Sequence, residues 1–463
     1  MSRTLYDLIG LAAGVAFILA LKGLSHPKTA RRGNLIGAFG AALATLVVFF
    51  YASPGSSLPL NNLGWILGAI FVGLAIGVPA ARKVQMTQMP QLVALFNGVG
   101  GGAAALVAIV EYLRLGNEAT TAEVIFTVFT VIVGCVSFSG SIITFMKLQE
   151  LMTTRPVIFP AGRFIIAATL VSVIGVGGWV VSALGTTPLL VLAGLSLLFG
   201  VLFVLPVGGA DVPIVISLLN AFTGLTVAAS GYVLDSVLLI IAGTLVGASG
   251  TILTRLMAEA MGRSLFGTLF GAFTAKPQAA SDSAEERPVR SGSPDDVAIL
   301  LNYARRVVIV PGFGLAVAQA QHTVRELADL MMSKGIDVAY GIHPVAGRMP
   351  GHMNVLLAEA NVPYDQLEEM DEINPTFSQT DVAIVIGAND VVNPAAENTP
   401  GCPIYGMPIL HVANAANVIF LKRSMRPGFA GIENELLYDP KTMLLFGDAK
   451  ASLTKVVSAL KAL

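Results

Sequence analysis

The sequence predicts a polytopic all-α membrane bundle of about nine transmembrane helices, followed by a cytoplasmic α/β domain built on a doubly wound parallel sheet. The 463 residues are 54% hydrophobic and only 12% charged, whereas about 25% of residues are charged in an average soluble domain. Charge is also unevenly divided, since only 13 of the 28 Lys and Arg and 8 of the 29 Asp and Glu precede Ala275. Beyond that residue, strand-like runs alternate with helical stretches. The chain therefore has a membrane half and a soluble half.

Nine apolar stretches are long enough to cross a bilayer as helices, which takes about 20 residues each. They are approximately Leu5 to Leu24, Leu35 to Tyr51, Leu63 to Ala81, Leu92 to Leu113, Val124 to Met146, Phe164 to Leu184, Leu189 to Leu205, Val212 to Leu234 and Val237 to Met257. No small-x-small cleavage site follows the first stretch, so we interpret it as a retained helix and not as a signal peptide.

Small residues at a spacing of four recur in these stretches and predict close helix packing, because lipid supplies little hydrophobic drive between helices. The pairs are Gly64 and Gly68, Gly73 and Gly77, Ser137 and Ser141, and Gly243 and Gly247.

The basic residues predict the orientation, because cytoplasmic loops carry an excess of Lys and Arg. Only Arg3 and Arg114 fall on one side. The other side holds Lys22, Lys28, Arg31, Arg32, Arg82, Lys83, Lys147, Arg155, Arg163, Arg255 and Arg263. With nine spans, the N-terminus lies outside and the C-terminal domain lies in the cytoplasm.

Few polar side chains fall at membrane depth, where such groups are costly and usually face a cavity, a partner or a pathway. Asn97 lies in the fourth stretch, and Asp211 and Asn220 lie at the start of and within the eighth. Asn220 should form one polar patch with Thr223 and Gly224. The alternative for Asn97 and Asn220 is an interhelical hydrogen bond that only holds the bundle together. Asp211 and Arg263 are also explained as interfacial charges at helix ends.

The domain boundaries follow from a change in composition. We expect a membrane domain at 1–262, a linker at 263–294 and a nucleotide-binding domain at 295–463, because Thr274 to Pro294 is rich in Ala, Ser, Pro and charge. The predicted strands are Val307 to Val310, Val338 to Ile342, Val382 to Ile386, Val418 to Leu421 and Met443 to Phe446.

A glycine fingerprint follows the first of these strands. It reads Gly312-x-Gly314-x-x-Val317 and is followed by a helical run through Leu330, with Val317 where a third glycine or alanine is usual. Glycine at the first two positions permits a tight turn and close approach of backbone amides to a pyrophosphate. The strand before it and the helix after it favour a Rossmann-like nucleotide site.

The ribose 2′ group distinguishes NAD from NADP, because an NAD site usually places an acid at the end of the second strand. Asp337 lies at the beginning of that strand instead. The strand Val418 to Leu421 leads directly into Lys422-Arg423-Ser424, which suits a phosphate monoester. This favours NADP, although an ordinary basic pair at the surface would give the same pattern.

Two more loops follow strands at the expected ligand edge, His343 to Asn354 and Gly387-Ala388-Asn389-Asp390. His343 and His352 have no carboxylate at ligand spacing, so we predict no metal site. Cys135 and Cys402 have neither the number nor the spacing of a disulfide framework or a zinc site. The net charge of −1 gives no basis for nucleic-acid binding.

These motifs resemble those of the beta subunit of bacterial proton-translocating NAD(P) transhydrogenase over essentially the full chain. The resemblance is carried by Pro311 to Gln321, His343 to Asn354, Gly387 to Asp390, Lys422 to Ser424 and Gly447-Asp448-Ala449-Lys450. It implies NADP(H) in this chain and NAD(H) in a partner alpha subunit with additional membrane helices. It further implies a dimer of alpha-beta units in the bacterial inner membrane, and direct hydride transfer between cofactors without a catalytic side chain.

The resemblance also implies site residues. The expected cofactor-binding residues are Gly312, Phe313, Gly314, Ala316, Val317, His343, Val345, Ala346, Gly347, Arg348, Gly387, Ala388, Asn389, Asp390, Lys422, Arg423, Ser424, Gly428, Gly447, Asp448 and Ala449. The expected proton pathway contains Asn97, Asp211, Asn220 and Arg263. Many members of the family have a histidine where this chain has Asn97. Asparagine cannot titrate, so either water or an ionisable group of the partner would take that role.

Two other function classes fit the same composition. One is a transporter or channel regulated by a nucleotide-sensing Rossmann-type domain, and the other is a membrane anchor for a soluble oxidoreductase. Reconstitution with the partner distinguishes them, because only the transhydrogenase links hydride transfer to proton movement.

Overall fold

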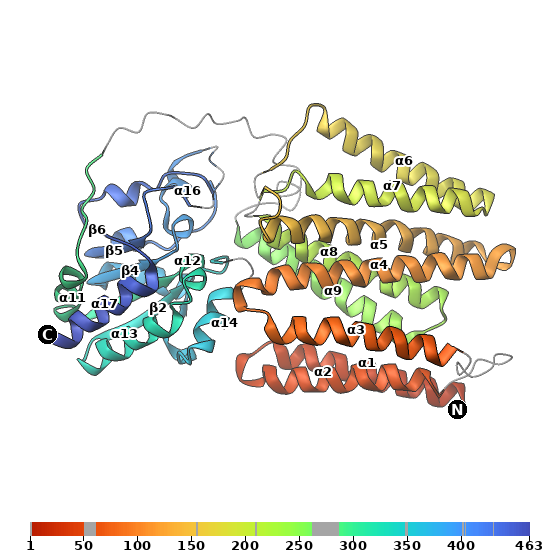
Figure 1. Ribbon diagram of the computed structural model, residues 1–463, viewed down its shortest axis with the longest axis horizontal. Helices are drawn as coiled ribbons and strands as arrows, with labels where there is room; N and C mark the ends of the chain where they lie inside the picture. Colours follow the sequence, from red (N-terminus) through yellow and green to blue (C-terminus); the bar gives the residue numbers. More distant parts are fainter. Residues whose placement is uncertain are drawn as a thin grey trace. The chain divides into compact units, whose positions relative to one another are not determined.

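The computed structural model describes residues 2–50, 62–153, 156–208, 211–261, 287–347, 351–400, 402, 404–428 and 430–463. The chain divides into two compact units, residues 1–207 with 214–254 and residues 208–213 with 255–463. The first contains the long helices and the second contains the sheet domain (Figure 1). Arg263, Arg348 and most of the expected linker lie outside the described residues.

Each of the nine predicted apolar stretches coincides with a long helix in the described part of the chain. The helices are α1 (Arg3–Leu24), α2 (Pro27–Val48), α3 (Leu63–Lys83), α4 (Met89–Leu115), α5 (Thr121–Leu148), α6 (Gly162–Ala183), α7 (Thr186–Val204), α8 (Val212–Val233) and α9 (Val237–Ala260). Among the described residues, eight of them are long and apolar enough to cross a membrane, and α2 is the exception. Arg31 and Arg32 lie near the start of α2 and lower its hydropathy. The predicted membrane bundle is confirmed.

Helix α5 is the centre of the first unit, with one of the two largest buried shares of its apolar window. It begins with a capping box in which Thr120 Oγ1 accepts the Glu123 N–H and Glu123 accepts the Thr120 N–H. A Cβ atom on Gly134 would lie 2.7 Å from the Gly101 carbonyl oxygen of α4, and one on Gly200 of α7 would lie 2.2 Å from Ser139 Oγ. Glycine is therefore what lets α4 and α7 approach α5 so closely.

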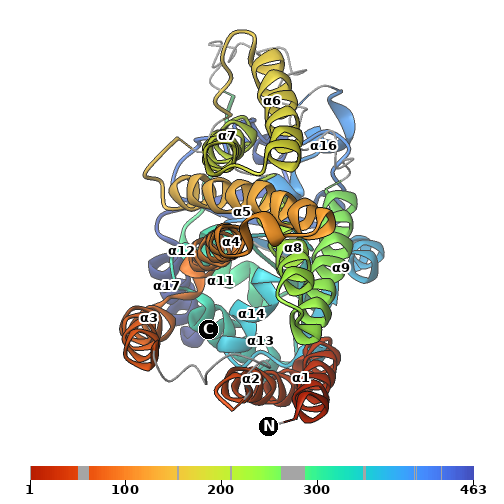
Figure 2. The same ribbon diagram turned by 90° about the vertical axis from the view of Figure 1, so that its right-hand side faces the viewer.

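The predicted small-residue packing holds for some helices and fails for α3. A Cβ atom on Gly243 of α9 would lie 2.3 Å from the Ala228 nitrogen of α8, so these two helices approach backbone to backbone. Around Gly64, Gly68, Gly73 and Gly77 of α3, by contrast, nothing described lies within 4 Å. None of the α3 residues is buried, and Figure 2 shows this helix apart from the others of the bundle. The expectation that its glycines pack against this chain's own helices is wrong.

The second unit contains a six-stranded parallel sheet in the order β3-β2-β1-β4-β5-β6. The strands are β1 (Arg306–Pro311), β2 (Asp337–Ile342), β3 (Leu367–Glu369), β4 (Val382–Ile386), β5 (Asn417–Lys422) and β6 (Thr442–Phe446). The strand order reverses between β1 and β4, which is the switch point where doubly wound sheets bind ligands. The five predicted strands are confirmed, and β3 was not predicted because two of its three residues are glutamates.

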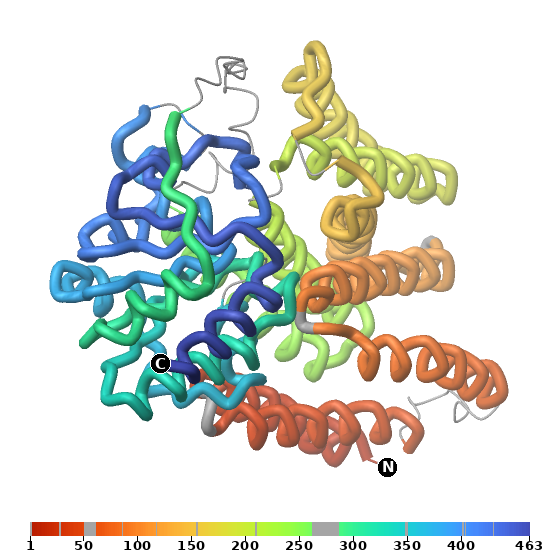
Figure 3. Tube along the Cα trace, turned by 60° about the vertical axis from the view of Figure 1, so that its left-hand side comes forward, coloured from red at the N-terminus to blue at the C-terminus, as the bar shows by residue number. Residues whose placement is uncertain are grey.

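Helices α11 (Pro294–Asn302) and α13 (Gln321–Ser333) both pack against the C-terminal helix α17 (Ala449–Ala462), which is dark blue in Figure 3. The helical run predicted through Leu330 is interrupted, because α12 (Phe313–Val317) ends before α13 begins. Gln319 has a φ of +48°, and the Ala320 N–H donates to the Leu315 carbonyl, which is the hydrogen bond that closes a Schellman motif. At the other end of the domain, residues 290–292 of the expected linker hydrogen-bond with Leu444 of β6.

Candidate nucleotide site and polar bundle network

The loops after β1 and β4 meet at the switch point through glycine backbone. The Gly312 N–H donates to the Ile386 carbonyl (2.9 Å) and the Gly314 N–H donates to the Gly387 carbonyl (3.2 Å). A Cβ atom on Gly314 would lie 2.7 Å from Gly387 Cα. Gly387 itself has a φ of +66°, a backbone conformation that favours glycine.

The two fingerprint glycines therefore have a role that the sequence did not reveal. Their amides bond to the neighbouring loop, and the lack of a side chain lets the two loops touch. Ala316 is buried and Val317 is half exposed, so α12 holds one expected site residue inside the domain and presents the other at its surface.

Beyond β4, Asn389 and Asp390 form a hydrogen-bonded group with the end of β5. Lys422 Nζ donates to Asn389 Oδ1 (3.0 Å), and Asn389 Nδ2 donates to Asp390 Oδ1 (3.0 Å). Asp390 Oδ2 accepts the Ala430 N–H (2.9 Å). Burial lowers the pKa of Lys422, while the Asp390 and Glu433 carboxylates act in the opposite direction.

Gly428 packs on this group, since a Cβ atom there would lie 2.3 Å from Asp390 Oδ1. Asn434, which the sequence analysis missed, donates from Nδ2 to the Asn389 carbonyl (3.0 Å). Its only sequence signal is an amide in a loop between two strands. Together these contacts hold the long β5–β6 connection against the β4 loop.

Arg423 and Ser424 extend from this group toward solvent. The Arg423 side chain is 65% exposed and its Nη2 lies 3.8 Å from Asp448 Oδ2, a loose ion pair. Asp448 caps α17 by accepting the Ala451 N–H (3.1 Å), and the preceding Gly447, with a φ of +146°, donates its N–H to the Lys422 carbonyl (3.0 Å). The ends of β5 and β6 thus bring Lys422, Arg423 and the loop through Ala449 to one edge.

The loop after β2 is anchored by His343. The Val345 N–H donates to His343 Nδ1 (3.2 Å), so Nε2 carries the proton and donates to the Pro408 carbonyl (2.7 Å). Burial lowers the His343 pKa to about 4, although the bond to Pro408 acts in the opposite direction. Both ring nitrogens of a neutral imidazole are occupied, and His343 is a structural anchor.

The same loop continues through a turn that brings it to α12. Ala346 is buried, and Gly347 has a φ of +110° with His352 so close that a Cβ atom would lie 2.5 Å from its Nδ1. The rings of His352 and Phe313 are 6.1 Å apart between centroids. The loops after β1 and β2 are therefore neighbours.

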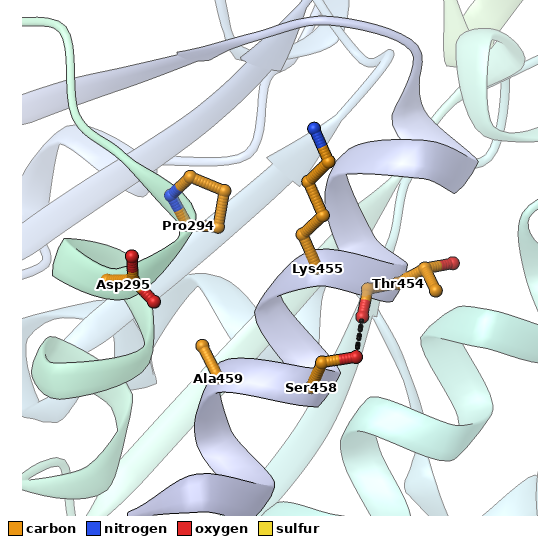
Figure 4. Close-up of a pocket in the computed structure, with 6 residues that line it drawn as sticks. All are labelled: Pro294, Asp295, Thr454, Lys455, Ser458 and Ala459. Carbon is orange, nitrogen blue, oxygen red and sulfur yellow. Dashed lines mark hydrogen bonds between the residues drawn. The ribbon is translucent and has the colours of Figure 1, made fainter.

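Neither a surface hollow nor, in the described part of the chain, a metal-binding cluster adds a residue to this edge of the sheet. A hollow of about 440 Å³ is lined by Pro294 and Asp295 of α11 and by Thr454, Lys455, Ser458 and Ala459 of α17 (Figure 4). None of these six is an expected site residue. Within the described ranges, no group of three or more His, Cys, Asp or Glu could hold a metal ion.

In the bundle, Asn97 belongs to a polar network that joins α4, α5 and α8. Asn97 Nδ2 donates to Ser141 Oγ (2.9 Å) and to Ser137 Oγ (3.3 Å). Ser137 Oγ also lies 3.0 Å from the Leu219 carbonyl and 2.6 Å from Thr223 Oγ1. Asn97 Oδ1 is buried and has no hydrogen-bond partner among the described residues.

The network corrects the predicted polar patch on α8. Thr223 faces Ser137, Gly224 packs on Gly247 of α9, and Asn220 is exposed in this chain. At 3.6 residues per turn, three residues separate two side chains by about 60° around a helix, which is enough to divide the patch. Asp211 is buried just before α8, and its N–H donates to the Gly208 carbonyl (3.0 Å).

Comparison with known proteins decides the family. The family model described as "NAD(P) transhydrogenase beta subunit" matches residues 6–459. The chain belongs to the NAD(P) transhydrogenase beta-subunit family. Two curated relatives, one from Rhodospirillum rubrum and one from a named strain of that organism, are called "NAD(P) transhydrogenase subunit beta". Each is 46% identical to this chain over 469 residues, and the match covers 99% of this chain and 100% of the relative.

The resemblance to the transhydrogenase beta subunit that the sequence predicts is thus confirmed. The structure adds Ser137, Ser141 and Asn434 to the residues that merit a functional test, and it gives Thr223, already expected in the polar patch of α8, a partner in Ser137. Ser137 and Ser141 were expected only as small packing residues, because their hydroxyls can be connected to Asn97 only when the contacting helix faces are known.

Proposed function

We propose that this chain is the NADP(H)-binding and proton-conducting subunit of a proton-translocating NAD(P) transhydrogenase. This oxidoreductase couples hydride transfer between NADH and NADP⁺ to proton movement across the membrane. The observation that carries the proposal is that the loops after β1, β4, β5 and β6 contact one another at the carboxyl edge of the sheet, next to the switch point between β1 and β4. Membership of the transhydrogenase beta-subunit family supports it.

The preference for NADP follows from the charges at the ends of the strands. Asp337 bonds to Arg306 Nη1 (2.5 Å) at the start of β2, away from the carboxyl edge where a ribose would bind. Arg423 is largely exposed and only loosely paired, and Ser424 is exposed beside it. A guanidinium and a hydroxyl in this position suit the 2′-phosphate of NADP.

Most of the expected ligand residues surround this edge. We propose that NADP(H) contacts the loops that contain Gly312 to Val317, His343 to Arg348, Gly387 to Asp390, Lys422 to Ser424 with Gly428, and Gly447 to Ala449, of which Arg348 lies outside the described residues. When bound, the nicotinamide ring supplies the hydride chemistry.

The protein's own contribution to that step is positioning. Direct transfer between two rings needs close, aligned placement and no acid, base or nucleophile. His343, a buried imidazole at this edge, is neutral with both nitrogens engaged. It holds a loop in place.

For the membrane half we propose a proton path through Asn97, Asp211, Asn220 and Arg263, extended by Ser137, Ser141 and Thr223. The buried Oδ1 of Asn97 is an acceptor that no described residue of this chain satisfies. A water molecule, or an ionisable group of the partner, would donate a hydrogen bond to this oxygen. That group would carry the proton, because the Asn97 side chain cannot titrate. A charge that crosses 100 mV carries about 2.3 kcal/mol, so the path has an energetic purpose.

The partner we propose is an alpha subunit that carries the NAD(H) domain and additional membrane helices. The α3 helix supports this, because its glycines and Trp65, which is 85% exposed, are covered by nothing described in this chain. We further propose a dimer of alpha-beta units in the bacterial inner membrane, with the N-terminus outside. The division into a membrane domain at 1–262, a linker at 263–294 and an NADP(H) domain at 295–463 is part of the same proposal.

Reconstitution tests the proposal. The chain is assembled with its alpha partner in vesicles and supplied with NADPH and an NAD analogue. We expect reduction of the analogue together with a change in the pH inside the vesicles. Binding of NADPH without any reduction of the analogue would exclude the enzyme and leave a transporter or channel with a nucleotide sensor.

A further inference from the structure

Lys147, in the last turn of α5, is fully buried, which is unusual for a lysine in a membrane bundle. Its ammonium group donates to three backbone carbonyls, those of Val204 (3.2 Å), Leu205 (2.6 Å) and Val207 (2.7 Å). These carbonyls lie at the C-terminal end of α7 and in the segment that follows it. We call this group the carbonyl clamp.

The clamp explains how a positive charge is tolerated there. The last carbonyls of a helix have no partner within the helix, and they form the negative end of its dipole. Three carbonyls match the three N–H donors of an ammonium group. An apolar side chain of the same length would fill the space, so the charge serves the carbonyls and not the packing.

Neighbouring bonds extend the clamp to two more segments. The Leu205 carbonyl also accepts the Val157 N–H (3.1 Å) from the connection before α6. Gln91, in the first turn of α4, donates from Nε2 to the Leu148 carbonyl (3.2 Å) next to Lys147. The ends of α4, α5 and α7 are thus joined by polar contacts.

The segment that the clamp holds leads directly to the proposed proton path. From Val207 the chain continues through Gly208 to Asp211, where α8 begins. Further along, α8 contacts α5 again at the Ser137 hydroxyl, through the Leu219 carbonyl and Thr223. Helix α5 therefore contacts the chain at Val207, before the start of α8, and again at Leu219 and Thr223 within α8.

We propose that Lys147 is a positioning residue for the proton step, because it fixes the C-terminal end of α7 as far as Val207, from which the chain leads to Asp211 and into α8. This inference rests on the proposed proton path. It assigns Lys147 to coupling and not to nucleotide binding.

The test uses Lys147→Met in the complete complex with the alpha subunit, reconstituted in vesicles. Methionine keeps the length of the side chain and removes its charge. We expect the number of protons moved per hydride to fall at least three-fold, with the dissociation constant for NADPH within two-fold of the parent. Lys147→Arg, which can still donate to the carbonyls, should keep more than half of the parental coupling. Lys83→Met, which removes an exposed charge, is the matched control and should change neither quantity.

Three results would overturn the inference. The first is an assembled Lys147→Met complex with parental coupling, and the second is a loss of hydride transfer and proton movement in equal proportion. If Lys147→Met does not assemble, Lys147→Gln is measured in its place by the same criteria. The third result is failure of both neutral variants to assemble while Lys147→Arg does, which would show a purely structural role. Asp211→Asn separates this inference from the proposed path, because unchanged proton movement in that variant would refute the path itself.

Discussion

The two halves of the chain use polar groups in opposite ways. In the sheet domain, the expected site residues lie on loops after parallel strands, so one edge collects glycines, amides and charges from segments far apart in the sequence. In the bundle, polar side chains are few, and a network of hydroxyls around Asn97 joins three helices. The comparison teaches that the topology of a parallel sheet brings polar groups from distant segments together at one edge. In the bundle, each polar contact between helices depends on a single side chain.

The largest expected effect tests the concentrated site at its glycine contact. Gly314→Val would force a side chain into Gly387, because even a Cβ atom would lie 2.7 Å from Gly387 Cα. We expect a loss of about 3 kcal/mol or more in the stability of the domain, with NADPH binding abolished. Thermal unfolding of the complex with and without NADPH measures this. Gly335→Ala is the control, because Gly335 has a φ of +83° but open space around it, and it should cost only about 1–2 kcal/mol. Equal effects at the two sites would contradict the account.

The next effect concerns Arg423, whose charge we propose selects NADP. Arg423→Ala should weaken NADPH binding about 10- to 100-fold, since a hydrogen bond to a charged group contributes about 1.5–3 kcal/mol. The dissociation constant, measured by calorimetry on the complex, checks it. Lys455→Ala on α17 is the control and should leave binding unchanged. A fall of similar size in both variants would show that only the overall charge matters.

The pH dependence of stability tests the His343 anchor. Its pKa is about 4 in the folded chain and about 6.5 when unfolded, so the unfolded state binds the proton more readily. Stability is therefore fully present above pH 6.5 and is lost progressively as the pH falls toward 4, by about 3 kcal/mol in total. Thermal unfolding between pH 7 and 5 should show this, and His343→Gln should flatten the profile while the exposed His322→Gln does not. An unchanged slope in His343→Gln would contradict the anchor.

The smallest effect tests the sparse network. Ser137→Ala removes the hydroxyl shared by Asn97, Leu219 and Thr223, at a cost of about 1 kcal/mol in stability, and we expect a partial loss of proton movement per hydride. Ser196→Ala is the matched control, because that buried hydroxyl donates only within its own helix, to the Leu192 carbonyl (2.7 Å). Proton movement that falls equally in both variants would show that the network has no special role.

The sequence predicted the elements well where local pattern determines them. Apolar runs located the helices, and buried strands such as Val382 to Ile386 were recognised by composition. The short β3 was missed because Glu368 and Glu369 give it no apolar pattern. The break at Gln319 was missed because a left-handed non-glycine residue leaves no clear signal.

Contacts between elements were harder to predict. The positions of Lys422 and Asn389 at strand ends followed from the parallel sheet, but their direct bond did not. In the bundle, spacing alone treated the glycines of α3 and the serines of α5 as equivalent, although among the described residues only the serines contact other helices. Which face of a helix is covered depends on neighbours that no local pattern describes.

The most direct test of the central claim, that one machine links the two halves, is an equilibrium measurement. The complex with its alpha partner is placed in vesicles with all four nicotinamide nucleotides, and a potential of about 100 mV is imposed. If one proton crosses for each hydride, about 2.3 kcal/mol shifts the ratio of NADPH to NADP⁺ by about forty-fold relative to that of NADH to NAD⁺, and reversing the potential reverses the shift. A ratio that does not respond to the potential, in vesicles where hydride transfer still occurs, would contradict the account.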